Sequence, residues 1–222
     1  MRIIEQSYEI LSLPNHPIIS IEQAARTCYK SEDKITLTSG FFLVQQLIDR
    51  KHHAMLEFED ITVKLITDRG VSHEMVRHRL CSFAQESTRY VRYGGDMEFI
   101  KPTWIEYGIS PAQNDFILPS DIPYKKKVAI TTFVESVYGS SIDYLRLLNN
   151  GLSPQDARTV LPNALKTEIV VKANLREWRH IFDLRCSKAA HPQIRALLLP
   201  LLKELSTKIP VIFDDLVTKY IK

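Results

Sequence analysis

Residues 77–90 have the sequence Arg-His-Arg-Leu-Cys-Ser-Phe-Ala-Gln-Glu-Ser-Thr-Arg-Tyr, and the rest of the chain is organised around them. Arginine binds phosphate oxygens through two parallel hydrogen bonds, and histidine adds a further donor. Ser87 and Thr88 can donate to an anion, while Gln85 and Glu86 can bond a ribose or a base edge. The regular apolar stripe of a surface helix is missing here. The stretch therefore indicates capture of a phosphorylated, polar small molecule.

Length and composition indicate an ordinary globular protein. The chain has 222 residues, of which 45% are hydrophobic and 25% charged, enough for one large domain or two small ones. Since no linker divides it, we expect a single catalytic domain over residues 1–222. The formal net charge of +3 argues against a dedicated nucleic-acid-binding protein. No apolar run reaches about 18 residues and Met1 does not open a signal peptide, so we expect a cytoplasmic protein without a membrane span.

The cysteines indicate a reducing compartment, because their number is odd and their spacing wide: Cys28, Cys81 and Cys186. Cys81 lies between Leu80 and Ser82, the surroundings of a structural thiol. Arg185 precedes Cys186 and could lower the pKa of its thiol, but we interpret this cysteine as structural too. Neither Cys-x-x-Cys nor His-x-x-x-His spacing occurs, so we expect no metal site.

The first half of the chain shows both strand and helix periodicity. We expect a strand over 2–13, a helix from Ser20 as its N-cap to Tyr29, and a helix from about 38 to 51. The apolar face of the second helix is expected to bury Phe42, Val44, Leu47 and Ile48. Residues 57–67 alternate as in a strand, with Ile61, Val63 and Leu65 on one face.

A short helix is expected from Ser72, as its N-cap, through Arg79. On this helix one face would carry Glu74, Arg77, His78 and Cys81. A solvated pair of Glu74 with Arg77 or His78 is the ordinary alternative to a binding role for that face.

In the second half we expect a long loop over 101–121, a long helix over about 123–150 ended by Gly151, and a helix capped by Ser153 that carries Arg158. Residues 167–173 alternate as a strand, and helices are expected over about 175–186, 190–206 and 209–221. On the 175–186 helix, Arg185 falls on the apolar stripe, where it needs an anionic ligand or a buried ion-pair partner.

Several motifs in order make the chain similar to the flavin-dependent thymidylate synthases. Arg77-His78-Arg79, seven intervening residues and Ser87 resemble the signature of this family, and Arg89-Tyr90 extends the match. Ala157 to Pro162 resembles its Ala-Arg-x-x-Leu-Pro motif. The Asn174-Leu175-Arg176 segment and Leu184-Arg185 resemble its later motifs, and His52 and Glu57 its upstream pair.

The resemblance implies an α+β fold with a central, mostly antiparallel sheet, flanking helices and the long helix at a subunit interface. It implies a homotetramer with shared active sites. The implied reaction is reductive methylation of deoxyuridylate (dUMP) to thymidylate (dTMP). Methylenetetrahydrofolate is the implied carbon donor, and FAD reduced by NADPH is the implied hydride source, so the other partners are folate and nicotinamide small molecules.

The resemblance also implies two sets of site residues. The dUMP-binding set is Glu74, Met75, Val76, Arg77, Gln85, Glu86, Ser87, Thr88, Arg89, Arg158 and Arg185. The FAD-binding set is His52, Ala54, Glu57, Arg77, His78, Arg79, Gln85, Asn174, Leu175, Arg176 and His180. His52 has a structural alternative, and His180 alone would more often be a core or surface histidine.

Arg185 and Ser87 are the expected catalytic residues. Guanidinium stays protonated, so Arg185 cannot be a general base, but it can stabilise an anionic pyrimidine and raise electron density at C5. Ser87 is expected to position substrate, because no His–carboxylate relay adjoins it in sequence. With no cysteine in a nucleophile context, we expect pyrimidine activation to be electrostatic.

Two other classes of function remain as alternatives. A nucleic-acid-binding module could use residues 77–92, because arginines alternate there with Phe83, Tyr90 and Tyr93, which could stack bases. A nucleotide phosphohydrolase is the second, but the sequence has no evident carboxylate cluster suited to Mg²⁺.

Overall fold

The structure is a computed structural model that describes residues 1–110 and 115–221. The chain forms two compact units, each assembled from three separate segments. Unit 1 consists of Met1–Ser7, Ile66–Glu74 and Gln85–Ile169, and unit 2 of Tyr8–Leu65, Met75–Ala84 and Val170–Lys222. The expected single domain stays a prediction, and the two units are described separately.

Unit 1 contains several small strands and one long helix. The strand β1 (Arg2–Ile4) pairs in parallel with β5 (Glu98–Ile100), and Arg2 forms an ion pair with Glu98 at 2.9 Å. The strands β6 (Gly108–Ser110) and β7 (Asp115–Ile117) form an antiparallel pair. The expected loop over 101–121 is therefore wrong in part, because the sequence showed too few apolar residues to reveal such short strands. Residues 111–114 lie outside the described residues.

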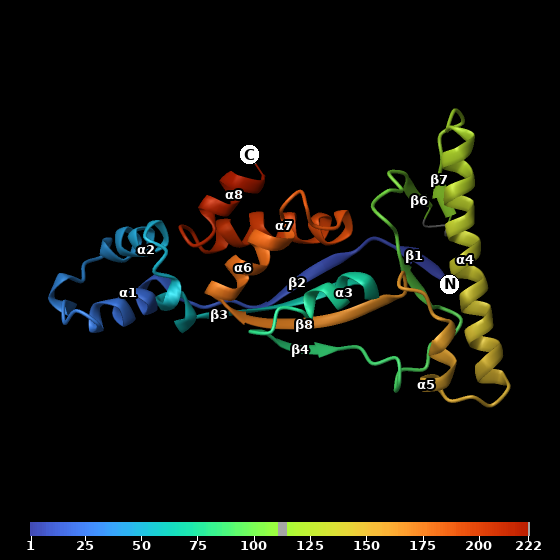
Figure 1. The fold of residues 1–222 in the computed structure, drawn as a ribbon, viewed down its shortest axis with the longest axis horizontal. Helices are drawn as coiled ribbons and strands as arrows, with labels where there is room; N and C mark the ends of the chain where they lie inside the picture. The colour runs from blue at the N-terminus through green and yellow to red at the C-terminus, as the bar shows by residue number, and fades with distance from the viewer. Residues whose placement is uncertain (111–114, 222) are drawn as a thin grey trace. The chain divides into compact units, whose positions relative to one another are not determined.

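The helix α4 (Tyr124–Asn149) confirms the predicted long helix (Figure 1). Gly151 ends it with a φ of +87°, a conformation that favours glycine. The helix α5 (Pro154–Ala157) and the 3₁₀ helix η3 (Arg158–Val160) follow, with Ser153 at the predicted N-cap. Tyr144 is fully buried, and its hydroxyl accepts a hydrogen bond from the Tyr93 backbone N–H at 3.3 Å. The core of unit 1 therefore includes one face of α4.

A four-stranded sheet has the order β2-β3-β8-β4. Its strands are β2 (Ser7–Ser12), β3 (Asp60–Asp68), β8 (Lys166–Asn174) and β4 (Ser82–Gln85). Burial alternates along β3, where Ile61, Val63 and Leu65 are fully buried as predicted. The α+β class with an antiparallel sheet is confirmed.

Helices make up most of unit 2. They are α1 (Pro17–Thr27), η1 (Glu32–Lys34), α2 (Ser39–Asp49), η2 (His53–Phe58), α6 (Leu175–Arg185), α7 (Pro192–Lys208) and α8 (Asp214–Tyr220). Figure 1 shows α6, α7 and α8 beside one another. Trp178 is fully buried on α6, and its indole N–H donates to the Ile61 carbonyl at 3.0 Å. This bond fixes the position of α6 against the strand β3.

Two predicted caps and one predicted burial are wrong. The helix α1 begins at Pro17, because proline suits a first helical position, so Ser20 lies inside the helix. The helix α3 (Arg69–Met75) begins before Ser72, because Asp68 Oδ1 accepts from the Val71 N–H at 2.7 Å and acts as its cap. Phe42 is exposed on α2, whose buried face carries Val44 and Ile48.

The helix α3 ends at Met75, so Arg77, His78 and Cys81 do not share a helical face with Glu74 as expected. The backbone continues as two turns, in which the His78 N–H donates to Met75 O and the Cys81 N–H donates to His78 O. His78 is buried as a result, while Arg77 and Arg79 are exposed.

Candidate active site

Unit 1 holds a polar cavity of about 280 Å³ beside the start of α3. Its lining residues are Arg69, His73, Thr88, Arg158, Thr159, Leu161, Pro162 and Asn163. Arg158 Nη1 donates to the hydroxyl of Thr88 at 3.1 Å, and Thr88 is buried. The structure therefore brings together two residues of the expected dUMP set that lie 70 positions apart in sequence.

Arg69 is a further cavity residue that the sequence analysis missed. Its backbone N–H donates to Asn163 O at 2.9 Å, which fixes the start of α3. Its Nη1 atom is buried and has no hydrogen-bond partner among the described residues. A buried, unpaired guanidinium nitrogen is costly, and an anion in the cavity would satisfy it. In the sequence, Asp68-Arg69-Gly70 has only the appearance of a polar turn.

The segment after β4 is held by hydrogen bonds within unit 1. The Gln85 amide donates to the hydroxyls of Ser72 at 2.9 Å and Thr167 at 3.1 Å. Glu86 accepts from the Tyr93 hydroxyl at 2.8 Å and from Lys166 Nζ at 3.4 Å. These contacts fix the backbone that carries the next residues, which are predicted to bind the nucleotide.

Ser87 and Arg89 follow in a turn that presents polar groups. The Arg89 backbone N–H donates to Ser87 Oγ at 3.3 Å. The guanidinium of Arg89 is exposed and lies 5.4 Å from the centre of the Tyr90 ring. An exposed arginine suits phosphate binding. The Ser87 hydroxyl accepts from the Arg89 backbone, and its O–H can still donate a hydrogen bond to a ligand.

Unit 2 brings Arg185 to the Arg-His-Arg motif. Arg185 Nε donates to His78 Nε2 at 3.1 Å, although the two residues are 107 positions apart. On its other side, His78 Nδ1 lies 3.4 Å from Glu177 Oε1. Burial, then the charges of Arg185 and His180, lower the pKa of His78 to about 4. His78 is therefore neutral near pH 7.

The local structure of α6 explains these positions. Asn174 Oδ1 accepts from the Glu177 N–H at 2.8 Å and caps the helix. The predicted stripe of Trp178, Ile181 and Phe182 is confirmed as fully buried. Arg185, at the end of the helix, is half-buried on the side of this stripe, so the predicted placement is confirmed.

The residues expected to bind FAD lie in unit 2, many of them around η2 and on α6, except for Gln85, which belongs to unit 1. Arg176 Nη1 and Glu57 Oε1 form an ion pair at 2.6 Å, and His52, Ala54 and His180 are exposed. Leu175 is fully buried and packs in the hydrophobic core. Arg77 and Arg79 form no ion pair with any residue that the structure describes, which leaves their guanidinium groups available to a ligand.

A cavity of about 670 Å³ lies beside these residues, within the range of about 300–1,000 Å³ for small-molecule sites. Its lining residues are Ile48, Lys51, His53, Leu80, Arg176, Glu177, Arg179, His180, Asp183, Asp215, Leu216 and Lys219. Two buried nitrogens, His53 Nε2 and Arg179 Nε, have no partner among the described residues. Burial, then the charge of Arg179, lower the pKa of His53, while the carboxylates of Asp183 and Asp215 are acceptors. The cavity thus offers charged donors and acceptors to a polar ligand.

Among the described residues, one group has atoms close enough together to hold a metal ion. A nitrogen of His78, a carboxylate oxygen of Glu177 and a nitrogen of His180 all lie within 4.8 Å of one another. The sequence could not reveal this group, because His78 comes from a distant segment. The donation from Arg185 places a positive charge beside His78, which opposes a cation there.

The thiols of Cys81 and Cys186 have raised pKa values. Burial, then the charge of Glu177, raise the pKa of Cys81 to about 12. Burial raises the pKa of Cys186 to about 12, so the lowering that Arg185 could have caused does not occur and the structural interpretation is supported. Both cysteines have the character of structural thiols.

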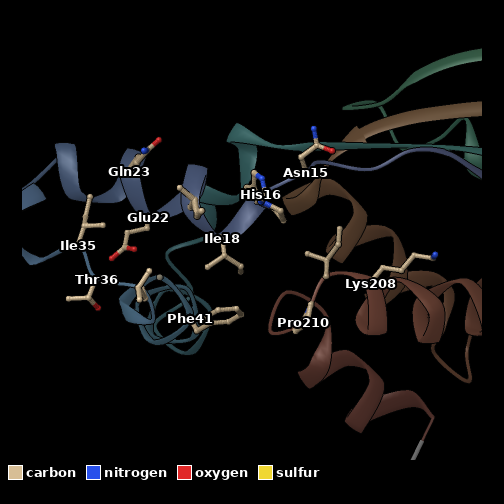
Figure 2. A pocket seen from close by; sticks show the side chains of 15 residues that line it. Asn15, His16, Ile18, Glu22, Gln23, Ile35, Thr36, Phe41, Lys208 and Pro210 are labelled. Carbon is tan, nitrogen blue, oxygen red and sulfur yellow. The ribbon is translucent and has the colours of Figure 1, made fainter.

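A second cavity in unit 2, of about 700 Å³, is largely apolar (Figure 2). Apolar residues of α1, α2 and the end of α7 line it, including Ile18, Phe41 and Pro210. Its buried acid, Glu22, accepts from Arg26 at 3.0 Å. No predicted site residue lines this cavity.

The helices in the described part of the chain are each too short or too polar to cross a bilayer.

Comparisons with known proteins agree with this geometry. The family model described as thymidylate synthase complementing protein matches residues 9–211. A flavin-dependent thymidylate synthase of Geobacter sulfurreducens is 31% identical over 206 residues, covering 90% of this chain and 82% of that protein. One from Corynebacterium efficiens is 33% identical over 201 residues, covering 88% and 78%. The chain belongs to the flavin-dependent thymidylate synthase family.

The fold is also that of a solved structure. A UMP/dUMP methylase, PolB, from Streptomyces cacaoi, bound with 5-Br dUMP, superposes with a TM-score of 0.79 and 21% identity. The match covers 99% of this chain and 98% of that one. At this identity the likeness establishes the fold.

Proposed function

We propose that this protein is a methyltransferase that converts dUMP to dTMP, with FAD as cofactor and methylenetetrahydrofolate and NADPH as co-substrates. The observation that carries the proposal is the 3.1 Å hydrogen bond between Arg185 and His78. It joins the two motifs on which the family resemblance most depends, and both side chains are at least half-buried. Family membership supports the same reaction.

The proposed dUMP site takes its phosphate-binding groups from unit 1. Arg158 and Thr88 line the 280 Å³ cavity, and the unpaired Arg69 Nη1 supplies a further donor. Charge-assisted bonds from guanidinium to phosphate are among the stronger polar contacts in proteins. Arg89 and Ser87 extend this site, and Gln85 and Glu86 position its backbone.

The residues around the 670 Å³ cavity fit FAD, because they combine charged donors with apolar walls. Arg176 and His180 would bond the diphosphate or its flanking groups, with exposed Arg77 and Arg79 as further donors. Leu80, an apolar residue of the cavity wall, would contact one of the ring systems of FAD. When bound, the flavin supplies the redox chemistry.

Arg185 is the proposed electrostatic catalyst. Its guanidinium is held by His78 and cannot lose its proton near pH 7, so it can stabilise negative charge on a bound pyrimidine. Cys81 and Cys186 are protonated near pH 7 because their pKa values are about 12, which supports activation without a thiol adduct.

We further propose that the two units act as one catalytic domain within a homotetramer with shared active sites. Complementation tests this. Arg158→Ala removes a proposed phosphate ligand, and Arg185→Ala removes the catalyst. If sites are shared between copies, co-expression of the two inactive variants restores part of the activity. No recovery, with tetramers still present by light scattering, would reject sharing.

The direct test of the proposed function is titration of the purified protein with FAD and dUMP. Oxidised flavin supplies its own absorbance, so dUMP binding beside it should perturb the spectrum. Product analysis should then detect dTMP. A protein that takes up no FAD, or that binds FAD and dUMP but forms no dTMP with both co-substrates, would reject the proposal.

A further inference from the structure

Glu177 is a buried carboxylate with no role so far. Only 5% of its surface is exposed, and it lies in the first turn of α6. Its Oε1 is 3.4 Å from His78 Nδ1, and His180 lies within the same small group. A carboxylate is rarely so buried without a partner that needs it.

The proton positions on His78 follow from its two neighbours. Arg185 Nε is an N–H donor under all ordinary conditions, so His78 Nε2 must carry the lone pair that accepts this bond. In neutral imidazole the proton then sits on Nδ1. The nearest carboxylate oxygen to Nδ1 is Glu177 Oε1, at 3.4 Å, and an acceptor there favours the same tautomer.

We propose that Glu177 is a positioning residue. It selects the Nδ1–H tautomer of His78 and thereby keeps Nε2 available to orient the Arg185 guanidinium. Without the carboxylate, His78 can carry its proton on Nε2, where two N–H groups would face each other and push Arg185 away. The catalytic consequence rests on the proposed function, whereas the tautomer does not.

The charges around His78 are consistent with this role. Burial raises the pKa of Glu177, while His180 and Arg176 lower it. His180 packs edge-on against the His78 ring, with centroids 5.7 Å apart. Arg185 and Glu177 therefore place opposite charges on opposite nitrogens of one neutral ring, an arrangement that resembles the orientation of a functional histidine by a carboxylate.

The tautomer can be measured by nitrogen NMR of the full chain labelled with ¹⁵N-histidine, before FAD or nucleotide is added. His78→Gln assigns the signal. We expect a protonated Nδ1 and an unprotonated Nε2 in the wild type and in Glu177→Gln, whose amide oxygen still accepts. Glu177→Leu should shift the signal toward the other tautomer. Asp49→Asn, an exposed carboxylate variant at the end of α2, should change nothing.

Two results would overturn the tautomer proposal. One is an Nε2-protonated or charged His78 in the wild type near pH 7. The other is stoichiometric binding of Zn²⁺ that removes the Nδ1 proton signal, since the same three residues would then be metal ligands. If Glu177→Leu fails to fold, Glu177→Ala takes its place, and an unchanged Nδ1–H tautomer in the folded variant would also overturn the proposal.

Kinetics test the link to Arg185. Glu177→Leu should lower kcat by about 10- to 100-fold, typical of groups that orient a functional ligand, while Glu177→Gln retains most activity. In an Arg185→Lys background, which keeps a positive charge but lacks the Nε–H that His78 accepts, Glu177→Leu should cost little more, because its effect passes through that donor. Equal losses in both backgrounds would reject the positioning role. A wild type that makes no dTMP would reject the proposed function instead.

Discussion

Replacing Arg69 by methionine should weaken nucleotide binding without weakening the fold. Methionine keeps an unbranched stem but removes the guanidinium, whose Nη1 is buried and has no hydrogen-bond partner in the part of the chain that the structure describes. An unsatisfied buried donor costs about 1–3 kcal/mol, so its removal should leave the unfolding temperature of the nucleotide-free protein unchanged or raised. Most arginine truncations at half-buried positions would have the opposite effect.

The expected loss of affinity for dUMP can be calculated from the hydrogen bond that Arg69 Nη1 would donate to the phosphate. A hydrogen bond from a charged group contributes about 1.5–3 kcal/mol, which is about 10- to 150-fold in the Kd for dUMP. Calorimetry on the FAD-loaded protein would measure this. Deoxyuridine lacks the phosphate, so its weaker binding should be the same in both proteins.

Arg146→Met is the matched control, because Arg146 is exposed on α4 and pairs with Asp143. It should change neither the unfolding temperature nor the affinity for dUMP. The reasoning fails if Arg69→Met binds dUMP as tightly as the wild type, or if it loses deoxyuridine affinity to the same extent.

Three further predictions concern stability and reactivity. The pKa of His78 falls from 6.5 to about 4 on folding, so its stabilising contribution is present above pH 6.5 and falls by about 3 kcal/mol as the pH drops to 4. Urea unfolding at several pH values should show a smaller loss for His78→Gln than for the wild type; equal losses would contradict a neutral His78. At pH 8, only about 10⁻⁴ of the Cys81 and Cys186 thiols is ionised, because their pKa values are about 12. Iodoacetamide should therefore label the exposed Cys28 well before the other two cysteines, and mass spectrometry can follow the order. Fast labelling of Cys81 would refute its burial. Gly40→Ala should destabilise the protein by about 1–3 kcal/mol, since its Cβ would lie 2.8 Å from Ile18 Cγ2. Gly139→Ala should stabilise α4, because outside the neighbouring backbone its Cβ would meet no described atom within 4 Å. Thermal unfolding distinguishes the two variants.

The sequence predicted those parts of the fold that a strong period defines. The alternation of Ile61, Val63 and Leu65 and the stripe of Trp178, Ile181 and Phe182 both became buried faces. Helix starts were predicted less well, because several residues compete to cap one turn. The helix α1 begins at Pro17 instead of after Ser20. Asp68, and not Ser72, provides the N-cap of α3.

The candidate site was predicted through motifs, whereas its supporting contacts were not. Nothing in the sequence places Glu177 against His78 or leaves Arg69 Nη1 unpaired, because both depend on burial between distant segments. Arg185 was expected on the core side of its helix from periodicity alone. The hydrogen-bond partner of Arg185 is His78, which lies in a turn where the sequence predicts a helix.

The most direct test of the account is dTMP formation by three forms of the reduced, FAD-loaded protein after mixing with dUMP and methylenetetrahydrofolate. The wild type should form dTMP, and so should a variant carrying Cys28→Ser, Cys81→Ala and Cys186→Ala. Arg185→Ala should retain FAD but form no dTMP. Loss of dTMP in the cysteine-free variant, together with its retention in Arg185→Ala, would contradict electrostatic activation by Arg185.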